Sequence, residues 1–297
     1  MRNGVSALLL LLAMLLPAPA EAWGFVGHRL ITERAIALLP PELKPFFEHY
    51  REEIVMRSVD PDLWRNIGWD EDPNHFLDFG APEYGAYPFA ALPRDYNAAL
   101  EKFGLTTLKR NGFVPWRFAE QYGSLRRAFE GFTRNAPYAS SDLPLFAAVA
   151  AHYIEDSHQP FHATINYDGR ETGNAGIHSR FERDLIEKFG SRLRLNPAPP
   201  VAITKARDFA FDTLLASYQL VDPILKADTE AAAGKEFYDD DYYEKFFTKV
   251  QPVLERRLSE AISAVAGMII GAWEAAGKPT LRTTDVRPVQ RVRPASR

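Results

Sequence analysis

Residues 254–273 read LERRLSEAISAVAGMIIGAW, and this stretch decides the class of fold. Its large apolar residues recur at steps of four, four, three, four and four, namely Leu254, Leu258, Ile262, Val265, Ile269 and Trp273. That spacing places them on one face of a helix that packs against a core. Gly277 and Pro279 follow where helices commonly end. The sequence therefore predicts a long amphipathic helix near the C-terminus.

The rest of the chain also favours helices, because no stretch alternates apolar and polar residues over enough positions to suggest a sheet. The other predicted helical ranges are 27–39, 45–58, 115–132, 142–156, 178–189 and 203–220. Asp142 is the expected N-cap of the helix that contains it. Between Asp60 and Pro115, Gly, Pro, Asp and aromatic residues dominate, which predicts a long loop-rich insert. We expect an all-α, single-domain, multi-helix protein without internal repeats.

Composition narrows the class of protein. With 297 residues, 46% of them hydrophobic and 25% charged, the chain falls in the ordinary globular range, which excludes a disordered, collagen-like or multi-span membrane protein. It contains no Cys, so any metal must be held by His, Asp, Glu or backbone groups. Residues 281–297 carry five Arg against one Asp and residues 1–22 are neutral, so the net charge of −4 leaves −8 on residues 23–280. Such an acidic body offers no basic footprint for duplex nucleic acid.

The first 22 residues have the features of an export signal. Arg2 precedes an apolar run from Val5 to Leu16, and Ala20-Glu21-Ala22 fits the small-x-small cleavage rule. The run is shorter than the roughly 20 residues that a membrane span needs. We expect a mature domain at 23–280, a flexible basic tail at 281–297, and a periplasmic or secreted protein. An uncleaved anchor is the alternative. Cleavage would turn the Trp23 nitrogen into a primary amine that can ligate a metal.

The spacing of His and carboxylate residues indicates the chemistry. His152 and Asp156 are four residues apart on a predicted helix, so both project from one face, and His178 and Glu182 repeat this arrangement. His162 lies between the two pairs. Each pair alone is a weak signal, but the whole set lies within 31 residues of a chain that has only seven His. Zinc accepts such a mixture of imidazole and carboxylate ligands.

These residues also resemble those of a known family. The residues that carry the likeness are Trp23, His28, Asp60, His75, the segment HYIEDSHQPFH at 152–162 and the segment GIHSRFE at 176–182. They resemble the motifs of the zinc-dependent phospholipase C family, whose superfamily also contains the single-strand-specific zinc nucleases. The resemblance runs from Trp23 to Glu182 and more loosely through the C-terminal helix. It implies the phospholipase C/nuclease type of all-helical fold and three zinc ions.

The resemblance also implies a ligand for each position. The first ion would take Asp60, His75, His152 and Asp156; the second His162, His178 and Glu182; the third the Trp23 amine and carbonyl, His28 and Asp156. It implies hydrolysis of a phosphate ester by a metal-activated water without a covalent intermediate, with Asp156 bridging two ions and Asp60 available as general base. Asp62 competes with Asp60, which is favoured because it precedes His75 by fifteen residues, as in the nucleases.

Two further His residues fall outside this ligand set. His158 has no ligand counterpart in the family, and we expect it at the rim of the site, behind the ligands or simply at the surface. His49 is expected to be an ordinary helix residue.

The motifs that bear on the class of phosphate ester are divided between the phospholipases and the nucleases. Glu182 resembles the last ligand of the phospholipases, where nucleases have Asp, whereas the short spacing from Trp23 to His28 is nuclease-like. Phe76 and Asp78 resemble residues with which nucleases bind a base, although phospholipases have a similar string. The phosphate-binding Arg of the nucleases, expected three residues after Asp60, is missing, because Leu63 stands there and Arg65 comes two residues later.

We therefore expect an exported zinc-dependent phosphodiesterase of the phospholipase C type acting on a phospholipid headgroup. A single-strand-specific endonuclease or nucleotidase of the same superfamily is the first alternative. A non-enzymatic exported binding protein that zinc merely stabilises is the second.

Overall fold

A computed structural model describes residues 23–285, so the predicted signal peptide and residues 286–297 of the predicted tail lie outside the described residues. Within that range the regular elements are helices and no strand is present, which confirms the all-α prediction. The α-helices are α2 (Gly24–Ala37), α3 (Lys44–His49), α4 (Arg51–Arg57), α5 (Asp60–Asn66), α6 (Tyr96–Asn111), α7 (Val114–Thr133), α8 (Ala139–Ser157), α9 (Ile177–Ser179), α10 (Leu185–Phe189), α11 (Ala206–Tyr218), α12 (Val221–Ala232) and α13 (Asp240–Ala275).

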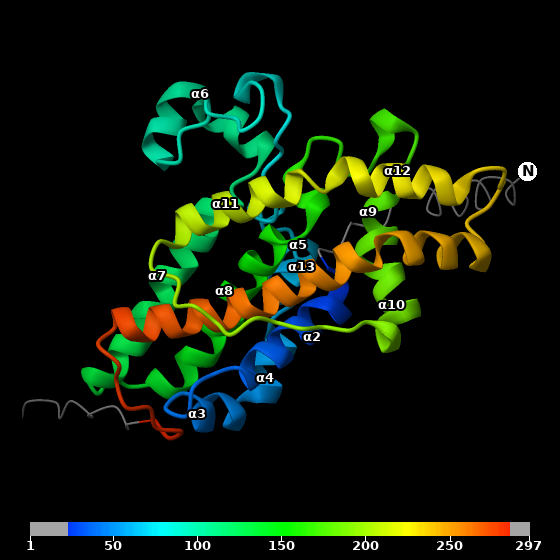
Figure 1. Cartoon of the computed structure of the whole chain (residues 1–297). Coiled ribbons are helices and arrows are strands. Elements are labelled where there is room, and N and C mark those ends of the chain that lie inside the picture. Colours follow the sequence, from blue (N-terminus) through cyan, green and yellow to red (C-terminus); the bar gives the residue numbers. More distant parts are fainter. Residues whose placement is uncertain (1–22, 286–297) are drawn as a thin grey trace, which may run out of the picture.

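Helix α13 runs the length of the molecule and contacts α2, α7, α8 and α12 (Figure 1). The apolar stripe that begins at Leu254 is buried along it, as predicted. The helix starts earlier than that stripe, at Asp240, where the Asp239 carboxylate accepts a hydrogen bond from the Tyr242 amide at 2.8 Å. It ends as expected, with Gly277 at a φ of 83°. Among the described helices only α13 is long and apolar enough to span a membrane, and 67% of its most apolar window is buried inside the molecule, as in a core helix.

Two of the predicted helices are divided into shorter elements in the structure. The range 45–58 forms α3 and α4, because the backbone at Tyr50 leaves the helical region with φ −101° and ψ 14°. The range 178–189 forms α9, a π-helical turn at Arg180–Asp184 and α10. The expected loop-rich insert contains α5 and α6, so it is less irregular than its composition suggests.

The start of α8 also differs from the prediction. The helix begins at Ala139, so Asp142 lies in its first turn and is not its N-cap. The backbone amide of Ser140, in the first turn of the helix, donates instead to the Asp285 carboxylate at 2.7 Å. Residues 281–285, assigned by composition to a flexible tail, are therefore anchored on α8. The Thr283 carbonyl also accepts a hydrogen bond from the Tyr50 hydroxyl at 2.8 Å.

Helix α8 occupies the interior, where it contacts α2, α4, α5, α7, α11 and α13. Small side chains allow its neighbours to approach closely, since Ala147, Ala148, Ala150 and Ala151 are all buried. Its C-terminal turns are buried as well, although they carry His152, Glu155 and Asp156. The fold thus brings polar side chains to the centre of the molecule, and buried polar groups of this kind need partners.

Candidate metal centre

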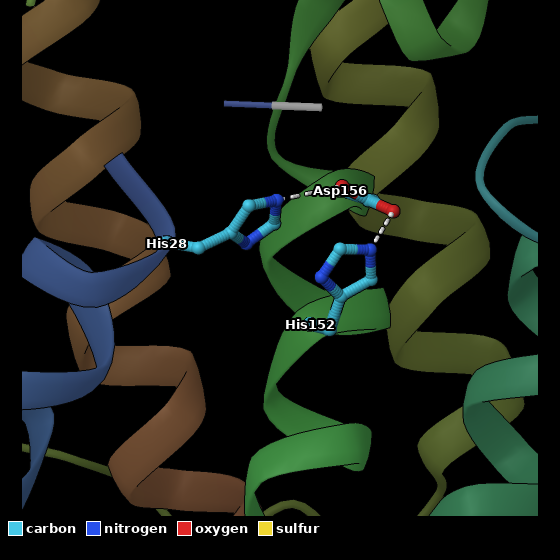
Figure 2. A group of neighbouring side chains, drawn as sticks. All are labelled: His28, His152 and Asp156. Carbon is cyan, nitrogen blue, oxygen red and sulfur yellow. Dashed lines mark ion pairs between the residues drawn. The ribbon is translucent and has the colours of Figure 1, made fainter. Parts of the chain in front are cut away.

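The first group of side chains joins α2 to α8. His28 of α2 lies with His152 and Asp156 of α8, and Figure 2 shows both imidazoles beside the one carboxylate. His28 Nε2 is 3.5 Å from Asp156 Oδ1, and His152 Nε2 is 3.3 Å from Asp156 Oδ2. The two rings stack with their centroids 4.2 Å apart. Asp156 therefore presents one oxygen to each imidazole, which confirms that His152 and Asp156 project from the same helix face.

The second group shares His152 with the first. Asp62 of α5 and His75 join His152, with the donor atoms of the three residues within 4.8 Å of one another. His75 Nδ1 lies 3.0 Å from His152 Nε2 and 3.0 Å from Asp156 Oδ2. The Asp62 Oδ1 atom is 3.7 Å from His75 Nδ1. Four residues from three parts of the chain thus surround one small volume.

The third group comes from the other end of the predicted motif. His162 Nε2 lies 3.1 Å from His178 Nε2, which in turn lies 2.9 Å from Glu182 Oε2. His162 follows Pro160, which starts a short 3₁₀ turn after α8, and His178 belongs to α9. Glu182 sits in the π-helical turn, still close to His178. Gln159 holds this carboxylate, donating from Nε2 to Glu182 Oε2 at 2.7 Å.

Hydrogen bonds on the outer side fix the orientation of three imidazoles. His152 Nδ1 donates to the Ser58 carbonyl at 2.8 Å, and His162 Nδ1 donates to the His75 carbonyl at 2.7 Å. His28 Nδ1 lies 2.5 Å from a carboxylate oxygen of Glu155. Because a carbonyl can only accept, the proton of His152 and of His162 sits on Nδ1 and the lone pair on Nε2 faces the group. Metal-ligating His residues are oriented in this way.

The electrostatics of the centre are those of a cation site. Burial, reinforced by Glu182, raises the pKa of Asp156 well above its ordinary value. Burial likewise raises the pKa of Asp62 to about 7. It lowers the pKa of His75 and of His162 well below the ordinary value, with neighbouring imidazoles adding to the effect. The site therefore presents neutral imidazole lone pairs beside acids that need a positive charge to remain ionised.

Unpartnered oxygens support the same conclusion. Both carboxylate oxygens of Asp62, Oδ1 of Asp156 and Oε1 of Glu182 are buried without a hydrogen-bond partner among the described residues. Leaving such groups unpaired is costly, and buried charges are commonly paired or coordinate metals. The nitrogen and oxygen donors suit a borderline-soft divalent ion. These buried groups could hold metal ions.

The structure places one predicted ligand, Asp60, outside the three groups. The Asp60 side chain is 26% exposed and lies 3.9 Å from Arg57, outside the three groups, whereas the Asp62 side chain is 1% exposed and lies inside one. The reason is helical phase: residues two apart on α5 point to nearly opposite sides. The spacing of fifteen residues to His75 favoured Asp60, because it does not contain the direction in which each side chain leaves the helix; the structure places Asp62, not Asp60, among the imidazoles.

Trp23 is close to the centre but is not seen as a ligand. In the full-length chain its nitrogen is an amide, and it donates to Glu182 Oε2 at 3.1 Å. Its carbonyl accepts from the Gly27 amide at 3.2 Å. The ring is fully buried, and its Nε1 donates to the Glu155 carbonyl at 2.7 Å. The predicted amine ligand requires cleavage before Trp23, which falls at the edge of the described residues.

The two predicted substrate-binding residues lie in the irregular segment after His75. Asp78 is 8% exposed, its amide donates to the Asn111 carbonyl at 2.7 Å, and its Oδ1 has no hydrogen-bond partner among the described residues. Burial raises the pKa of Asp78 well above its ordinary value. Phe76 is half-buried against Gly112. Neither residue belongs to the three groups.

The remaining His residues are placed away from the ligand groups. His158 is buried, and its Nδ1 donates to the Ile154 carbonyl at 2.7 Å. It lines a separate cavity of about 780 Å³ between α11 and α13, to which none of the ligand groups contributes. His49 lies at the exposed end of α3, as expected. His158 is therefore a buried residue rather than a surface or rim residue.

Sequence reasoning missed residues that support the ligands. Glu155 contacts His28, and Glu71 accepts a hydrogen bond from the hydroxyl of Tyr153, whose ring lies 5.9 Å from that of His75. Glu155 had a readable signal, because an acid next to Asp156 on an Ala-rich buried helix needs a partner.

Comparison with known proteins adds no identification, since no protein-family model matches the chain and a search of curated proteins returns no match.

Proposed function

We propose that the protein is an exported zinc-dependent hydrolase of phosphodiester bonds. The observation that carries the proposal is the set of three buried His/carboxylate groups, two of which share His152. The groups match in kind and order the residues on which the resemblance to the zinc phospholipase C and nuclease superfamily rests, with Asp62 in place of Asp60. The proposed domain comprises residues 23–280.

Three zinc ions would be divided among the groups as follows. Asp62, His75, His152 and Asp156 would hold the first; His162, His178 and Glu182 the second; His28, Asp156 and the Trp23 amine and carbonyl the third. Asp156 is shared, which agrees with its position between His28 and His152. The third set is complete only after cleavage before Trp23, so N-terminal sequencing of the exported protein should begin at Trp-Gly-Phe.

Zinc bound in these groups would lower the pKa of water toward neutrality and neutralise the charge of a phosphoryl group. The side chains have distinct tasks. His152 and His162 keep their protons on the outer nitrogens, so their lone pairs remain directed into the site. We assign the proton-accepting role to Asp62 rather than Asp60, since of these two carboxylates it is that of Asp62 that lies among the imidazoles. No Ser, Lys or Cys nucleophile belongs to the groups.

A phospholipid is the substrate class that we put first. Exposed apolar side chains flank the ligand positions on both sides in sequence: after Asp62, Leu63 of α5 is 41% exposed and Ile67, directly after α5, is 65% exposed. On the other side Tyr167 is 49% exposed, and its ring centroid is 6.1 Å from that of His178. Exposed apolar and aromatic residues close to the ligand positions in sequence suit a substrate with an acyl body and a phosphate head. The net negative charge of the domain is compatible with such a substrate.

A single-strand-specific nuclease is the second candidate, and the assignment of Asp62 in place of Asp60 as a ligand favours it. Counted from Asp62, the residue three positions later is Arg65, the type expected in the nucleases. Arg65 Nη1 lies 3.6 Å from Asp62 Oδ1, and its side chain is 18% exposed. It is therefore near enough to the centre to meet a phosphate oxygen. This removes one of the sequence arguments against a nuclease.

One assay separates the candidates. Purified zinc-loaded protein is incubated with phosphatidylcholine vesicles, with single-stranded DNA and with RNA, each with and without a chelator. Chelator-sensitive release of phosphocholine supports the phospholipase, and release of 5′-mononucleotides supports the nuclease. Zinc that stabilises the protein while neither ester is cut would support the non-enzymatic binding protein. Capture of a phosphoenzyme by mass spectrometry would contradict direct hydrolysis.

A further inference from the structure

Glu155 joins α2 to α8 at the centre of the molecule. Its side chain is fully buried. One carboxylate oxygen accepts from the Thr32 hydroxyl at 2.7 Å, and the other lies 2.5 Å from His28 Nδ1. Its backbone carbonyl accepts from Trp23 Nε1 at 2.7 Å. A single residue of α8 therefore binds two positions of α2 and the residue that precedes this helix.

These contacts favour one tautomer of the His28 ring. The Thr32 hydroxyl donates to one oxygen of Glu155, and the other oxygen lies 2.5 Å from His28 Nδ1, where it can accept the Nδ1 proton of the imidazole. A proton on Nδ1 leaves the lone pair on Nε2, the nitrogen that lies 3.5 Å from Asp156 Oδ1. A carboxylate on the outer nitrogen also makes the inner nitrogen a stronger ligand.

Glu155 differs from the other orienting groups. His152 and His162 are oriented by backbone carbonyls, of Ser58 and of His75, which no substitution removes. Among the described ligand residues, His28 is the one whose outer nitrogen meets a carboxylate that is not itself in a ligand group. The orientation of this ligand can therefore be abolished by changing one residue that no group contains.

We propose that Glu155 is the positioning residue for His28 and controls metal binding by the group of His28, His152 and Asp156. Glu155 acts by holding the proton on His28 Nδ1 and by fixing α2 against α8. The group of His162, His178 and Glu182 is independent of it. The metal part of this inference rests on the proposed function, whereas the tautomer of His28 does not.

The first experiment needs no metal. In metal-free protein labelled with ¹⁵N-histidine, NMR should show His28 protonated at Nδ1 in the wild type. Glu155→Ala should shift both His28 nitrogen resonances away from that tautomer and leave those of His162, which has no contact with Glu155 or His28 among the described residues, unchanged. Thr32→Val is the matched control, because it removes one hydrogen bond of Glu155 and keeps the contact with His28. An unchanged His28 spectrum in Glu155→Ala would overturn the proposal.

The second experiment measures zinc by equilibrium dialysis and elemental analysis. In Glu155→Ala, one zinc per chain should bind about 10- to 100-fold more weakly, the usual effect of removing such a partner. His28→Ala should lose the same ion, and the double variant should lose no more, since both changes act on one interaction. Glu155→Gln should recover part of the affinity, because its amide oxygen still accepts from Nδ1. Thr32→Val should bind zinc as the wild type does.

The outcomes are distinguishable. Wild-type zinc affinity in Glu155→Ala overturns the positioning role while leaving the proposed function intact. A wild type that binds no zinc overturns the proposed function, and the tautomer of His28 still decides the role of Glu155. If Glu155→Ala does not fold, comparison of Glu155→Gln with Thr32→Val decides it, because a purely structural role predicts equal zinc binding in these two variants.

Discussion

At the scale of single residues, two aspartates of α5 offer a matched test. Asp62→Asn removes a carboxylate that lies among the imidazoles, so we expect phosphodiesterase kcat/KM to fall by about 100-fold or more, the range seen for loss of such groups. Asp60→Asn removes only a partly exposed contact with Arg57, which is worth about 0–1 kcal/mol, and should keep full activity and zinc content. The opposite order, with zinc lost in Asp60→Asn and kept in Asp62→Asn, would restore the original assignment.

The same two residues show what the sequence can specify. His152 and Asp156, like His178 and Glu182, are four apart, and a helix or helical turn brings residues at that spacing to one face whatever the surroundings. The choice between Asp60 and Asp62 depends on the rotation of α5 about its axis, which packing sets. In the structure that rotation is seen from the two buried residues of α5, Pro61 and Asp62. The number of residues between an aspartate and His75 gives no information about it.

At the scale of elements, the start of α8 depends on a distant residue. The Asp285 carboxylate accepts from the Ser140 amide at 2.7 Å and from the Ser141 hydroxyl at 2.5 Å. Asp285→Ala should therefore lower the free energy of unfolding by about 1 kcal/mol, the usual worth of such a cap. Thr284→Ala, an exposed neighbour, is the control and should change little.

The pH dependence of that cap has a definite sign. The hydrogen bonds from Ser141 and Ser140 outweigh burial and lower the pKa of Asp285. Because the folded pKa is below the unfolded value, the contribution is complete above the unfolded pKa of about 4 and is lost as the pH falls through the folded pKa. Urea unfolding should show the difference between wild type and Asp285→Ala at pH 7 and a smaller difference near pH 3. A difference that grew on acidification would contradict the cap.

A pair of glycine substitutions tests how closely the backbone at Ile203 approaches α13. The carbonyl of Ile203 would lie 2.1 Å from a Cβ added to Gly271, so Gly271→Ala should destabilise the protein by about 1–3 kcal/mol, as overpacking does. Gly123 of α7 meets only the end of the Arg127 side chain at 3.4 Å. Gly123→Ala should therefore raise the free energy of unfolding by about 0.5–1 kcal/mol. Chemical denaturation measures both, and equal effects would contradict the close crossing.

The helices that could be predicted from the sequence are those in which apolar residues recur at helical spacing over many positions. The ranges expected at 115–132 and 203–220 correspond to α7 and α11, and the stripe from Leu254 lies in α13. Helix α6 was missed because it is two pieces joined at Gly104, whose φ of 75° is not helical, and it buries few side chains. Helix α12 does bury residues at helical spacing, among them Val221, Ile224 and Leu225, but its Asp- and Ala-rich sequence made that signal weak.

At the scale of the whole molecule, the candidate centre links elements that are far apart in the sequence. Its side chains come from α2, α5, the segment after α5, α8, the turn after α8, and the stretch from α9 into the π-helical turn. Without a cation, Asp62, Asp156 and Glu182 are buried together, with carboxylate oxygens that have no hydrogen-bond partner within residues 23–285. Removing zinc should therefore weaken the whole fold rather than one loop. At a free zinc concentration 1,000 times the dissociation constant, one site contributes about 4 kcal/mol.

Calorimetry measures this effect. A chelator should lower Tm by several degrees, and zinc should restore it, whereas magnesium should not, because magnesium prefers oxygen ligands and these groups are rich in imidazole. Asp156→Ala is the matched variant: it removes the carboxylate that faces His28, His75 and His152, so its Tm should respond much less to zinc. A wild-type Tm that ignores both chelator and zinc would exclude the enzymatic and the purely structural reading together, because each requires the cation to compensate these buried acids.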